Sequence, residues 1–328
     1  MKPKVAFYWC ASCGGCEEAV LDLYEDLLAV LDAIEIVFWP VALDFKEHDF
    51  AAMPEGSVDI AFVNGAIRTS DQKHMATLLR EKAKVVVAFG ACAQLGGIPG
   101  LANLTTAEEI LHDVYGDAAT MPQTEYREDG VSLALPELFD QVLPLDRVVP
   151  VEYYVPGCPP TPNIIQSAIG ALLSGLAPVR GSVLAPDHAL CEECPRKATR
   201  PVDLAIERLR QVHEQLIDSE TCLLAQGVPC LGPATRAGCG TRCIRGNMPC
   251  TGCFGPTGRV RDYGGKALSA IASILSADEE QEIGRILEGL PDPAGTLYRY
   301  SLPSCSLTRK PEYTHVGRNG KPAESNHH

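Results

Sequence analysis

Fourteen cysteines are the residues of this chain whose type and spacing could do chemistry. Twelve of them divide by spacing into three sets of four, each containing a Cys-x2-Cys pair. The first set is Cys13, Cys16, Cys92 and Cys158, the second is Cys191, Cys194, Cys222 and Cys230, and the third is Cys239, Cys243, Cys250 and Cys253. Four thiolates are what one cubane [4Fe–4S] cluster requires. The spacing therefore predicts three metal sites, with Cys10 and Cys305 left outside them.

Zinc bound by four cysteines is the alternative to an iron–sulfur cluster. Zinc ribbons draw their ligands from two nearby knuckles, whereas the first set spans 146 positions of the chain. Glycine and proline also crowd the thiols, as in Gly157-Cys158-Pro159-Pro160. Glycine lets backbone amides reach cluster sulfurs and proline adds stiff apolar bulk, and both influence a reduction potential. The pattern favours iron–sulfur clusters over a zinc-stabilised scaffold, which stays open as an alternative.

Charge and hydropathy limit the partners and the cellular compartment that we expect for this protein. The net charge of −14 argues against nucleic acid or an anionic membrane as the main partner. The two longest charge-free stretches, 153–179 and 85–107, are interrupted by prolines or glycines, so we expect no membrane insertion. Met1 leads almost directly into a strand-like segment without a signal peptide, which predicts a cytoplasmic protein. In that reducing compartment metal ligation is a better explanation of the cysteines than disulfides.

The elements that must position the first set alternate between strands and helices. Short β-branched or aromatic runs predict buried strands, and apolar residues at helical spacing predict helices between them. The predicted strands are 5–9, 34–39, 59–64, 84–89 and 148–155, and the predicted helices are 16–32, 69–81 with Thr69 or Ser70 as its cap, and 161–176. The pattern of apolar residues is less regular over 101–147, which indicates an insertion in this segment. This alternation predicts an α/β fold with a flavodoxin-like, doubly wound parallel sheet.

Three predicted strands lead directly into cysteines of the first set. Cys13 and Cys16 follow the first strand, Cys92 follows the strand at 84–89, and Cys158 follows the strand at 148–155. Open α/β sheets bind ligands beyond the carboxyl ends of their strands. We therefore expect these four thiols to converge at one edge of the sheet.

The second half of the chain differs from the first in its charge balance and in its expected secondary structure. Residues 1–185 carry 11 basic and 25 acidic side chains, and residues 186–328 carry 17 of each. We predict a first domain over 1–185, a cysteine-rich and mostly irregular iron–sulfur domain over 186–300, and a polar tail over 301–328. Within the second domain the spacing predicts a helix over 201–217 and one or two helices over 267–290. With few large apolar residues of its own, this domain needs metal to hold its shape.

Three motifs resemble those of the small subunit of nickel–iron hydrogenases. They are Cys13-Gly14-Gly15-Cys16-Glu17, Phe89-Gly90-Ala91-Cys92-Ala93 and Pro156-Gly157-Cys158-Pro159-Pro160. By this resemblance the first set holds the proximal cluster, the third set the medial cluster and the second set the distal cluster. The same half-domain recurs in a quinone-reducing complex I subunit, but that relative has only the first site. An electron-wire subunit of such a non-hydrogenase complex is therefore the less favoured alternative.

The resemblance implies partners and cofactors as well as a fold. Three [4Fe–4S] clusters in this chain would carry electrons from a nickel–iron centre that lies only in a partner large subunit. The electron acceptor would be a soluble iron–sulfur or flavin module. All-cysteine sites and the missing leader are similar to the cytoplasmic branch, which includes viologen-reducing, heterodisulfide-reductase-linked and deazaflavin-reducing enzymes. The sequence itself contains no catalytic residue for bond making, because it has no nickel ligands.

A few other residues have both a functional and a structural interpretation. Glu17 and Glu18 could move protons near the first set, although the helix dipole favours carboxylates in a first turn anyway. Asn64, at the end of a strand, could line the same site. His188 lies three residues before Cys191, without the spacing of a metal ligand. The glycine-rich segment 96–100 lacks the strand and helix that a nucleotide site needs.

Overall fold

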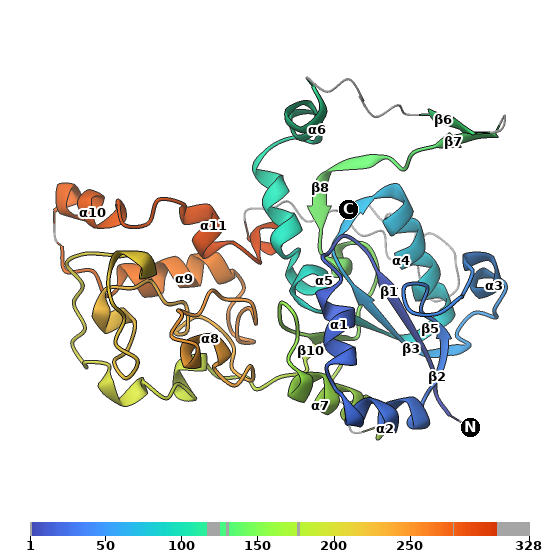
Figure 1. The fold of residues 1–328 in the computed structure, drawn as a ribbon, viewed down its shortest axis with the longest axis horizontal. Coiled ribbons are helices and arrows are strands. Elements are labelled where there is room, and N and C mark those ends of the chain that lie inside the picture. The colour runs from blue at the N-terminus through green and yellow to red at the C-terminus, as the bar shows by residue number, and fades with distance from the viewer. Residues whose placement is uncertain (1, 117–124, 129–130, 176–177, 278, 307–328) are drawn as a thin grey trace, which may run out of the picture.

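The computed structural model describes residues 2–116, 125–128, 131–175, 178–277 and 279–306 (Figure 1). For 125–128 and 131–134 the structure describes the backbone only. The polar tail predicted from 301 onward therefore lies mostly outside the described residues, as does the predicted helix end at Leu176. In the described part of the chain, no helix is long and apolar enough to cross a bilayer.

A six-stranded parallel sheet forms the first part of the molecule, as the alternation of strands and helices predicted. Its order is β10-β9-β5-β3-β1-β2, in which β2, β1, β3, β5 and β9 follow the flavodoxin arrangement and β10 extends it. The strands are β1 (Lys4–Trp9), β2 (Glu35–Phe38), β3 (Val58–Asn64), β5 (Ala83–Phe89), β9 (Tyr153–Val155) and β10 (Ser182–Val183). The predicted fold class is confirmed.

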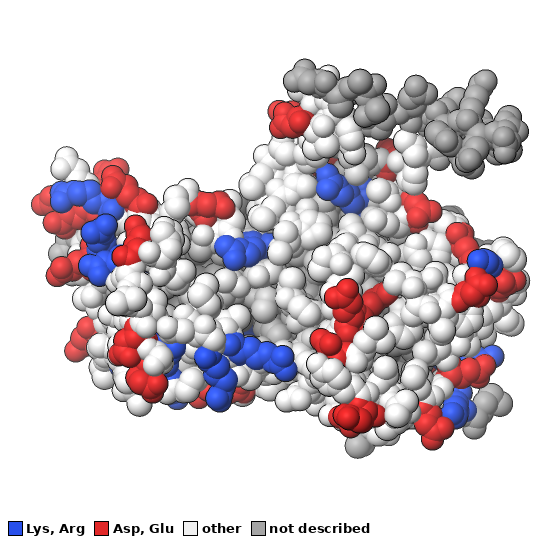
Figure 2. All heavy atoms as spheres, in the orientation of Figure 1, with Lys and Arg blue, Asp and Glu red and all other residues white. Residues whose placement is uncertain are grey.

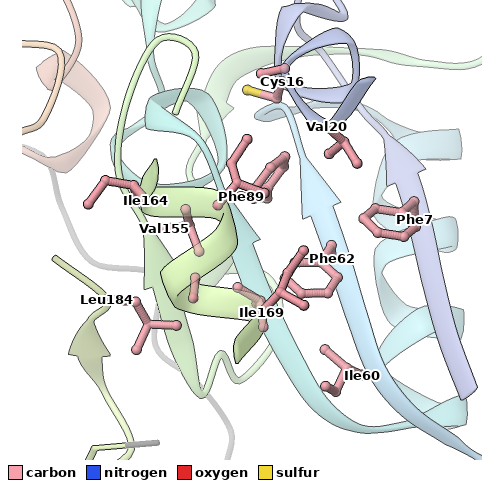
Figure 3. Packing of buried hydrophobic residues seen from close by; sticks show 14 of the residues in the cluster. Phe7, Cys16, Val20, Ile60, Phe62, Phe89, Val155, Ile164, Ile169 and Leu184 are labelled. Atoms are coloured by element: carbon pink, nitrogen blue, oxygen red, sulfur yellow. The ribbon is translucent and has the colours of Figure 1, made fainter. Parts of the chain in front are cut away.

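Helices cover both faces of this sheet, and two apolar cores result. Alternate residues of each strand point to opposite faces, so Val5 and Phe7 enter one core while Ala6 enters the other. On the first face, strand residues such as Phe62 and Phe89 pack beneath Ile164 and Ile169 (Figure 3). That face carries α1 (Gly15–Leu21), α2 (Glu25–Ala33) and α7 (Pro162–Leu173), and the other carries α3 (Glu47–Ala51), α4 (Ser70–Lys82) and α5 (Ala91–Leu95).

The helix predicted over 16–32 is in fact two helices. The chain breaks between α1 and α2 at Tyr24, which has a φ of 51°. The break leaves Val20 and Leu23 in the core, while Leu28 on α2 is exposed. Apolar spacing alone did not show this change of direction, because both halves continue the same helical pattern.

The helix α4 begins where the sequence predicted it. Thr69 accepts a hydrogen bond from the backbone N–H of Gln72, and the Gln72 side chain accepts one from the Thr69 N–H in return. The strand predicted over 148–155 is shorter, since β9 starts only at Tyr153. Pro150 has no N–H for a ladder, and the chain before it forms a short turn over Leu145–Arg147.

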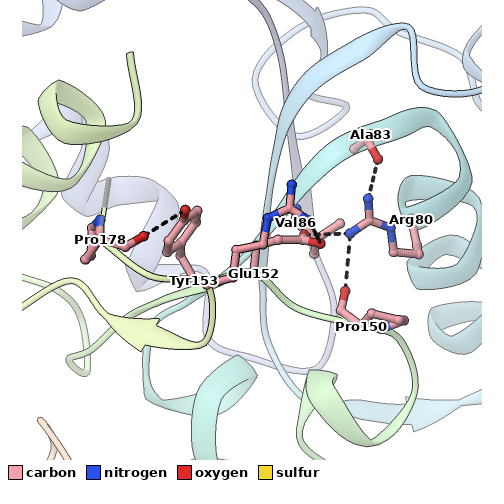
Figure 4. Close-up of polar contacts among 8 residues, drawn as sticks. Arg80, Ala83, Val86, Pro150, Glu152, Tyr153 and Pro178 are labelled. Atoms are coloured by element: carbon pink, nitrogen blue, oxygen red, sulfur yellow. Dashed lines mark hydrogen bonds and ion pairs between the residues drawn. The ribbon is translucent and has the colours of Figure 1, made fainter. Parts of the chain in front are cut away.

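The half-buried carboxylate of Glu152 lies just before the start of β9. Glu152 Oε2 accepts hydrogen bonds from Val86 N at 2.8 Å and from Arg80 at 2.6 Å (Figure 4). Arg80 also donates to the carbonyls of Pro150 and Ala83, which ties the end of α4 to β5 and β9. The resulting register sets the position of Cys158, three residues beyond β9.

The segment 101–147 lies outside the six-stranded sheet, in agreement with an insertion. It contains η1 (Ile98–Leu104, a 3-10 helix), α6 (Ala107–Tyr115), β6 (Glu125–Glu128), β7 (Val131–Ala134) and β8 (Leu138–Leu143). The strand β8 pairs with β4 (Ile67–Thr69) in a separate antiparallel ladder, and β6 pairs with β7. In Figure 1, α6 and the β6–β7 ladder project away from the sheet.

The part of the chain after β10 is mostly irregular. Its helices are short: α8 (Arg242–Arg245), α9 (Tyr263–Ala272), α10 (Glu280–Leu287) and α11 (Pro293–Leu297). The pair α9 and α10 confirms the helices predicted over 267–290. A third apolar core, which includes Leu190, Leu224 and Ile271, packs around the buried cysteines Cys230 and Cys250.

The helix predicted over 201–217 is wrong. In this segment only Val212–Glu214 forms a single 3-10 turn. Ile206 instead exchanges backbone hydrogen bonds with Ile274 and Ser276, and Arg210 N donates to the carbonyl of Gly227. Its apolar residues are therefore buried one at a time along an extended path, while Leu216 is fully exposed. Tertiary partners at distant positions overrode the local helical pattern.

Candidate iron–sulfur centres

The structure brings the four thiols of the first set to one edge of the sheet. Burial raises the pKa of the Cys16 thiol most, and the nearby thiols of Cys92, Cys158 and Cys13 raise it further. Burial also raises the pKa of Cys92 to about 12, again with Cys158 and Cys13 as its charged neighbours. The three strand ends therefore place the four sulfurs within electrostatic reach of one another.

Two glycines leave room for these sulfurs. A Cβ on Gly90 would collide with Cys16 Sγ, and one on Gly97 would collide with Cys92 Sγ. Both glycines also have positive φ angles, of 88° and 59°, which side chains disfavour. The close approach of backbone to sulfur at these positions thus requires glycine.

The thiols of the second set face one another in the irregular part of the chain. Burial raises the pKa of Cys191 to about 12, and its charged neighbours include Cys230, Cys194 and Cys222. Cys191 Sγ and Cys230 Sγ both approach Gly232, at 3.2 and 3.8 Å from the position of a Cβ. This set is therefore also gathered around one point.

The third set lines a cavity of about 210 Å³ between the two parts of the chain. Besides Cys239, Cys243, Cys250 and Cys253, the wall includes Cys158 of the first set. It also includes Asp22 from the end of α1 and Arg242 of α8. Figure 2 shows acidic side chains of the sheet part and basic side chains of the irregular part facing each other across the middle of the view.

Contacts between sets show that the third set lies between the other two. Cys158 lines the same cavity as Cys253, and, besides burial, its backbone and thiol both influence the pKa of Cys253, which links the first set to the third. Cys250 N donates to Cys230 Sγ at 3.3 Å, which links the third set to the second. The spatial order is therefore first, third, second, although the chain order is first, second, third.

Thiol chemistry tests whether these residues suit iron–sulfur clusters. Burial holds the pKa of Cys92, Cys191 and Cys253 at about 12, so their thiolates need a compensating cation. Iron supplies such a charge and displaces the thiol protons. Among the described residues, no three His, Cys, Asp or Glu side chains stand close enough to hold a single ion. In a cubane, each thiolate binds its own iron atom. The donor sets fit this group.

Relatives of known type match nearly the whole chain. The iron–sulfur subunit of an F420-non-reducing hydrogenase from Archaeoglobus profundus is 38% identical over 94% of this chain and 99% of its own length. A vhu subunit of an F420-non-reducing hydrogenase from Methanocaldococcus jannaschii is 40% identical, over 94% of this chain and 97% of its own length. The chain belongs to the hydrogenase iron–sulfur subunit family.

Two further matches agree with this assignment. Residues 13–172 match the family of the NADH ubiquinone oxidoreductase 20 kDa subunit. The fold also resembles the recombinant [NiFeSe] hydrogenase of Desulfovibrio vulgaris Hildenborough, with a TM-score of 0.51 and 18% identity over 78% of this chain and 94% of that one. This hydrogenase subunit is thus part of an oxidoreductase, has an electron-transfer role and works with a large subunit that carries the catalytic site.

The two remaining cysteines of the hydrogenase subunit lie apart from the three sets. Cys10 belongs to the core on the opposite face of the sheet from Cys16 and is 5% exposed. Burial raises the pKa of its thiol, so at neutral pH it behaves as a small apolar side chain. Cys305 is equally buried, beyond α11.

Cys10→Ala and Cys305→Ala should therefore leave the iron content of the purified protein unchanged. We expect each variant to lose only about 1 kcal/mol of unfolding free energy, as a small change in a core does. Iron determination per chain and thermal unfolding check both expectations. Loss of iron from either variant would mean that the ligand sets are grouped wrongly.

Glu17 is buried next to Cys16, whereas Glu18 is exposed. Both oxygens of the Glu17 carboxylate accept hydrogen bonds, from Trp39 Nε1 and from Asn64 Nδ2, each at 3.0 Å. Burial raises the pKa of Glu17, and these two donors oppose the rise. Asn64 Oδ1 in turn accepts from Ser12 Oγ at 2.8 Å, so the network fixes the loop before Cys13. Asn64 therefore lies beside the loop of the first set, as the sequence predicted, and its hydrogen bonds give it a structural role there.

Trp39 is a member of this network that the sequence analysis missed. A tryptophan at the end of a buried strand needs an acceptor for its indole N–H, and this need was the available signal. His188 Nε2 forms a hydrogen bond with Glu193 Oε1 at 3.0 Å, so this ring nitrogen is engaged outside the three sets. In the segment 96–100, Gly96 and Gly100 pack against Pro303, so close packing accounts for these two glycines.

Proposed function

We propose that this hydrogenase subunit conducts electrons from its large subunit through three [4Fe–4S] clusters to a soluble acceptor. The first set would hold the proximal cluster, the third the medial cluster and the second the distal cluster. The observation that supports this order is the pair of contacts between sets, Cys158 with Cys253 and Cys250 with Cys230. An uninterrupted series of thiol sites is what stepwise electron transfer needs, because each transfer covers a short distance.

The acceptor would be an iron–sulfur or flavin module, such as one related to heterodisulfide reductase. The relatives from Archaeoglobus and Methanocaldococcus are named as F420-non-reducing. Because F420 is a deazaflavin coenzyme, these names favour an acceptor other than a deazaflavin. A cytoplasmic site fits fourteen cysteines without a disulfide. We also propose the division near residue 185 into a sheet domain and a cluster domain, with a polar tail after 300.

The complex I-like alternative is less well supported. The 20 kDa subunit family matches only 13–172, the part that holds the first set. Eight further cysteines in two compact sets lie beyond that range. A quinone-linked subunit would have no use for them.

Anaerobically purified chain should contain about twelve irons, from about four in each of three cubanes, and it should be brown. Iron and zinc are measured together by elemental analysis, with visible absorbance as a second readout. A value near eight irons would show that one set is vacant or misassigned. Zinc in place of iron, in a colourless protein, would instead support the zinc scaffold.

A further inference from the structure

Arg196 is a buried arginine within the second set of cysteines. It lies two residues after Cys194, and only 4% of it is exposed. Taking a guanidinium out of water costs several kcal/mol unless it is hydrogen-bonded or paired with an opposite charge. The charge of Arg196 therefore needs an explanation.

Four acceptors hold this guanidinium, and none is a carboxylate. One nitrogen donates to the carbonyls of Asp218 and Thr221, at 3.2 and 3.3 Å. The other donates to the carbonyl of Ile244 at 3.1 Å and to Asn247 Oδ1 at 2.8 Å. No carboxylate in the described part of the chain lies within ion-pair distance of Arg196. The exposed Asp218 carboxylate feels its charge only weakly, after the Thr221 hydroxyl that mainly lowers the pKa of that group.

These acceptors come from loops that carry two different cysteine sets. Thr221 directly precedes Cys222 of the second set, and Ile244 directly follows Cys243 of the third. Arg196 thus holds together the backbones beside three proposed ligands, including its own neighbour Cys194. A rigid, planar donor group suits this task, because it can bind several acceptors at fixed angles.

The other buried arginine of this region has a different arrangement. Arg236 is 3% exposed and also donates to carbonyls, those of Pro256, Pro186 and Ala185. Its charge, however, is paired with the Asp187 carboxylate at 2.9 Å. Arg236 is therefore locally neutralised, whereas Arg196 leaves a net positive charge among the cysteine loops.

We propose that Arg196 is a positioning residue for electron exit, which fixes the second-set loop against the third and provides the buried positive charge that favours reduction of the second-set cluster. This inference rests on the proposed clusters. A cubane with four thiolates is negatively charged and becomes more so on reduction, so a fixed cation among the loops that carry its ligands stabilises the reduced form. Arg200, whose charge opposes the rise that burial causes in the pKa of Cys191, adds to the same positive field. Electrons are then drawn toward the second set.

The test measures the midpoint potential of each cluster by redox titration with electron paramagnetic resonance, in the assembled complex. Arg196→Gln removes the charge, Arg196→Lys keeps it without the planar fork, and Arg236→Gln is the matched control. We expect Arg196→Gln to lower the equilibrium constant for reduction of the second-set cluster at least tenfold. For one electron this is a fall of about 59 mV in its midpoint potential. We expect Arg196→Lys to retain most of the potential, and Arg236→Gln to leave it unchanged despite a lower stability.

Two results would overturn the proposal. One is a normal potential in Arg196→Gln with all iron present. The other is a shift of the same size in Arg236→Gln, which would show that any buried charge has this effect. If Arg196→Gln fails to bind iron, the Arg196→Lys variant decides between the outcomes. Wild-type iron content and potential in Arg196→Lys would support the role of the fixed charge, whereas the same loss of iron would contradict it. An iron count near twelve in wild-type chain establishes the clusters independently, so failure of the proposed function is distinguishable.

Discussion

Cys222→Ala should disconnect the assembled hydrogenase from its natural acceptor while leaving hydrogen activation intact. Cys222 belongs to the second set, which lies farthest from the sheet edge in the spatial order of the sets. Hydrogen–deuterium exchange needs only the centre of the large subunit, so we expect it to continue at the wild-type rate. Reduction of the natural acceptor should fall by more than the roughly 10–100-fold that loss of a supporting group costs a metal site.

Small viologen dyes offer a third readout in the same variant. Because Cys243 of the third set is exposed, such a dye could take electrons there, and its reduction should fall less than that of the natural acceptor. Cys305→Ala serves as the control for loss of a cysteine outside the sets. If Cys222→Ala abolished exchange in a complex that still assembles, the second set would not be the exit site.

Cys16→Ala should damage both exchange and acceptor reduction. The Cys16 thiol lies within electrostatic reach of the other three thiols of the first set, and the missing side chain of Gly90 makes room for its sulfur. Its loss would leave the proposed proximal cluster with three ligands and expose the buried Cys92 thiol to an unfilled space. We expect iron to fall toward about eight per chain, with one of three cubanes missing.

The matched control for this variant is Cys10→Ala, six residues earlier in the same loop region. Cys10 packs in the opposite core of the sheet, so its removal tests the effect of a lost thiol without a lost ligand. Co-purification of the large subunit shows whether the interface survives in each variant. Full exchange activity in Cys16→Ala would contradict the assignment of the first set beside the large subunit.

The sequence alone determined the sheet and the edge at which the first set gathers. The strands could be predicted because residues buried on both faces leave continuous apolar runs, and parallel strands must all end at the same edge. The start of α4 was likewise local, since Thr69 and Gln72 lie only three residues apart. The division of the cysteines into sets remains a prediction from spacing, to which the structure adds their placement.

Residue spacing did not decide which set adjoins which; the family resemblance implied the order, and the tertiary structure supplies the contacts between the sets. Chain order puts the second set before the third, yet Cys250 meets Cys230 and Cys253 meets Cys158, so the third lies between. Long-range contacts of the same kind hold the segment 201–217 extended against Ile274 and Gly227, so it does not form the predicted helix. Arg196 too has its partners up to 51 residues away, and no local pattern marks them. In a part of the chain with so little regular secondary structure, contacts between distant residues decide the conformation, and residue spacing does not record them.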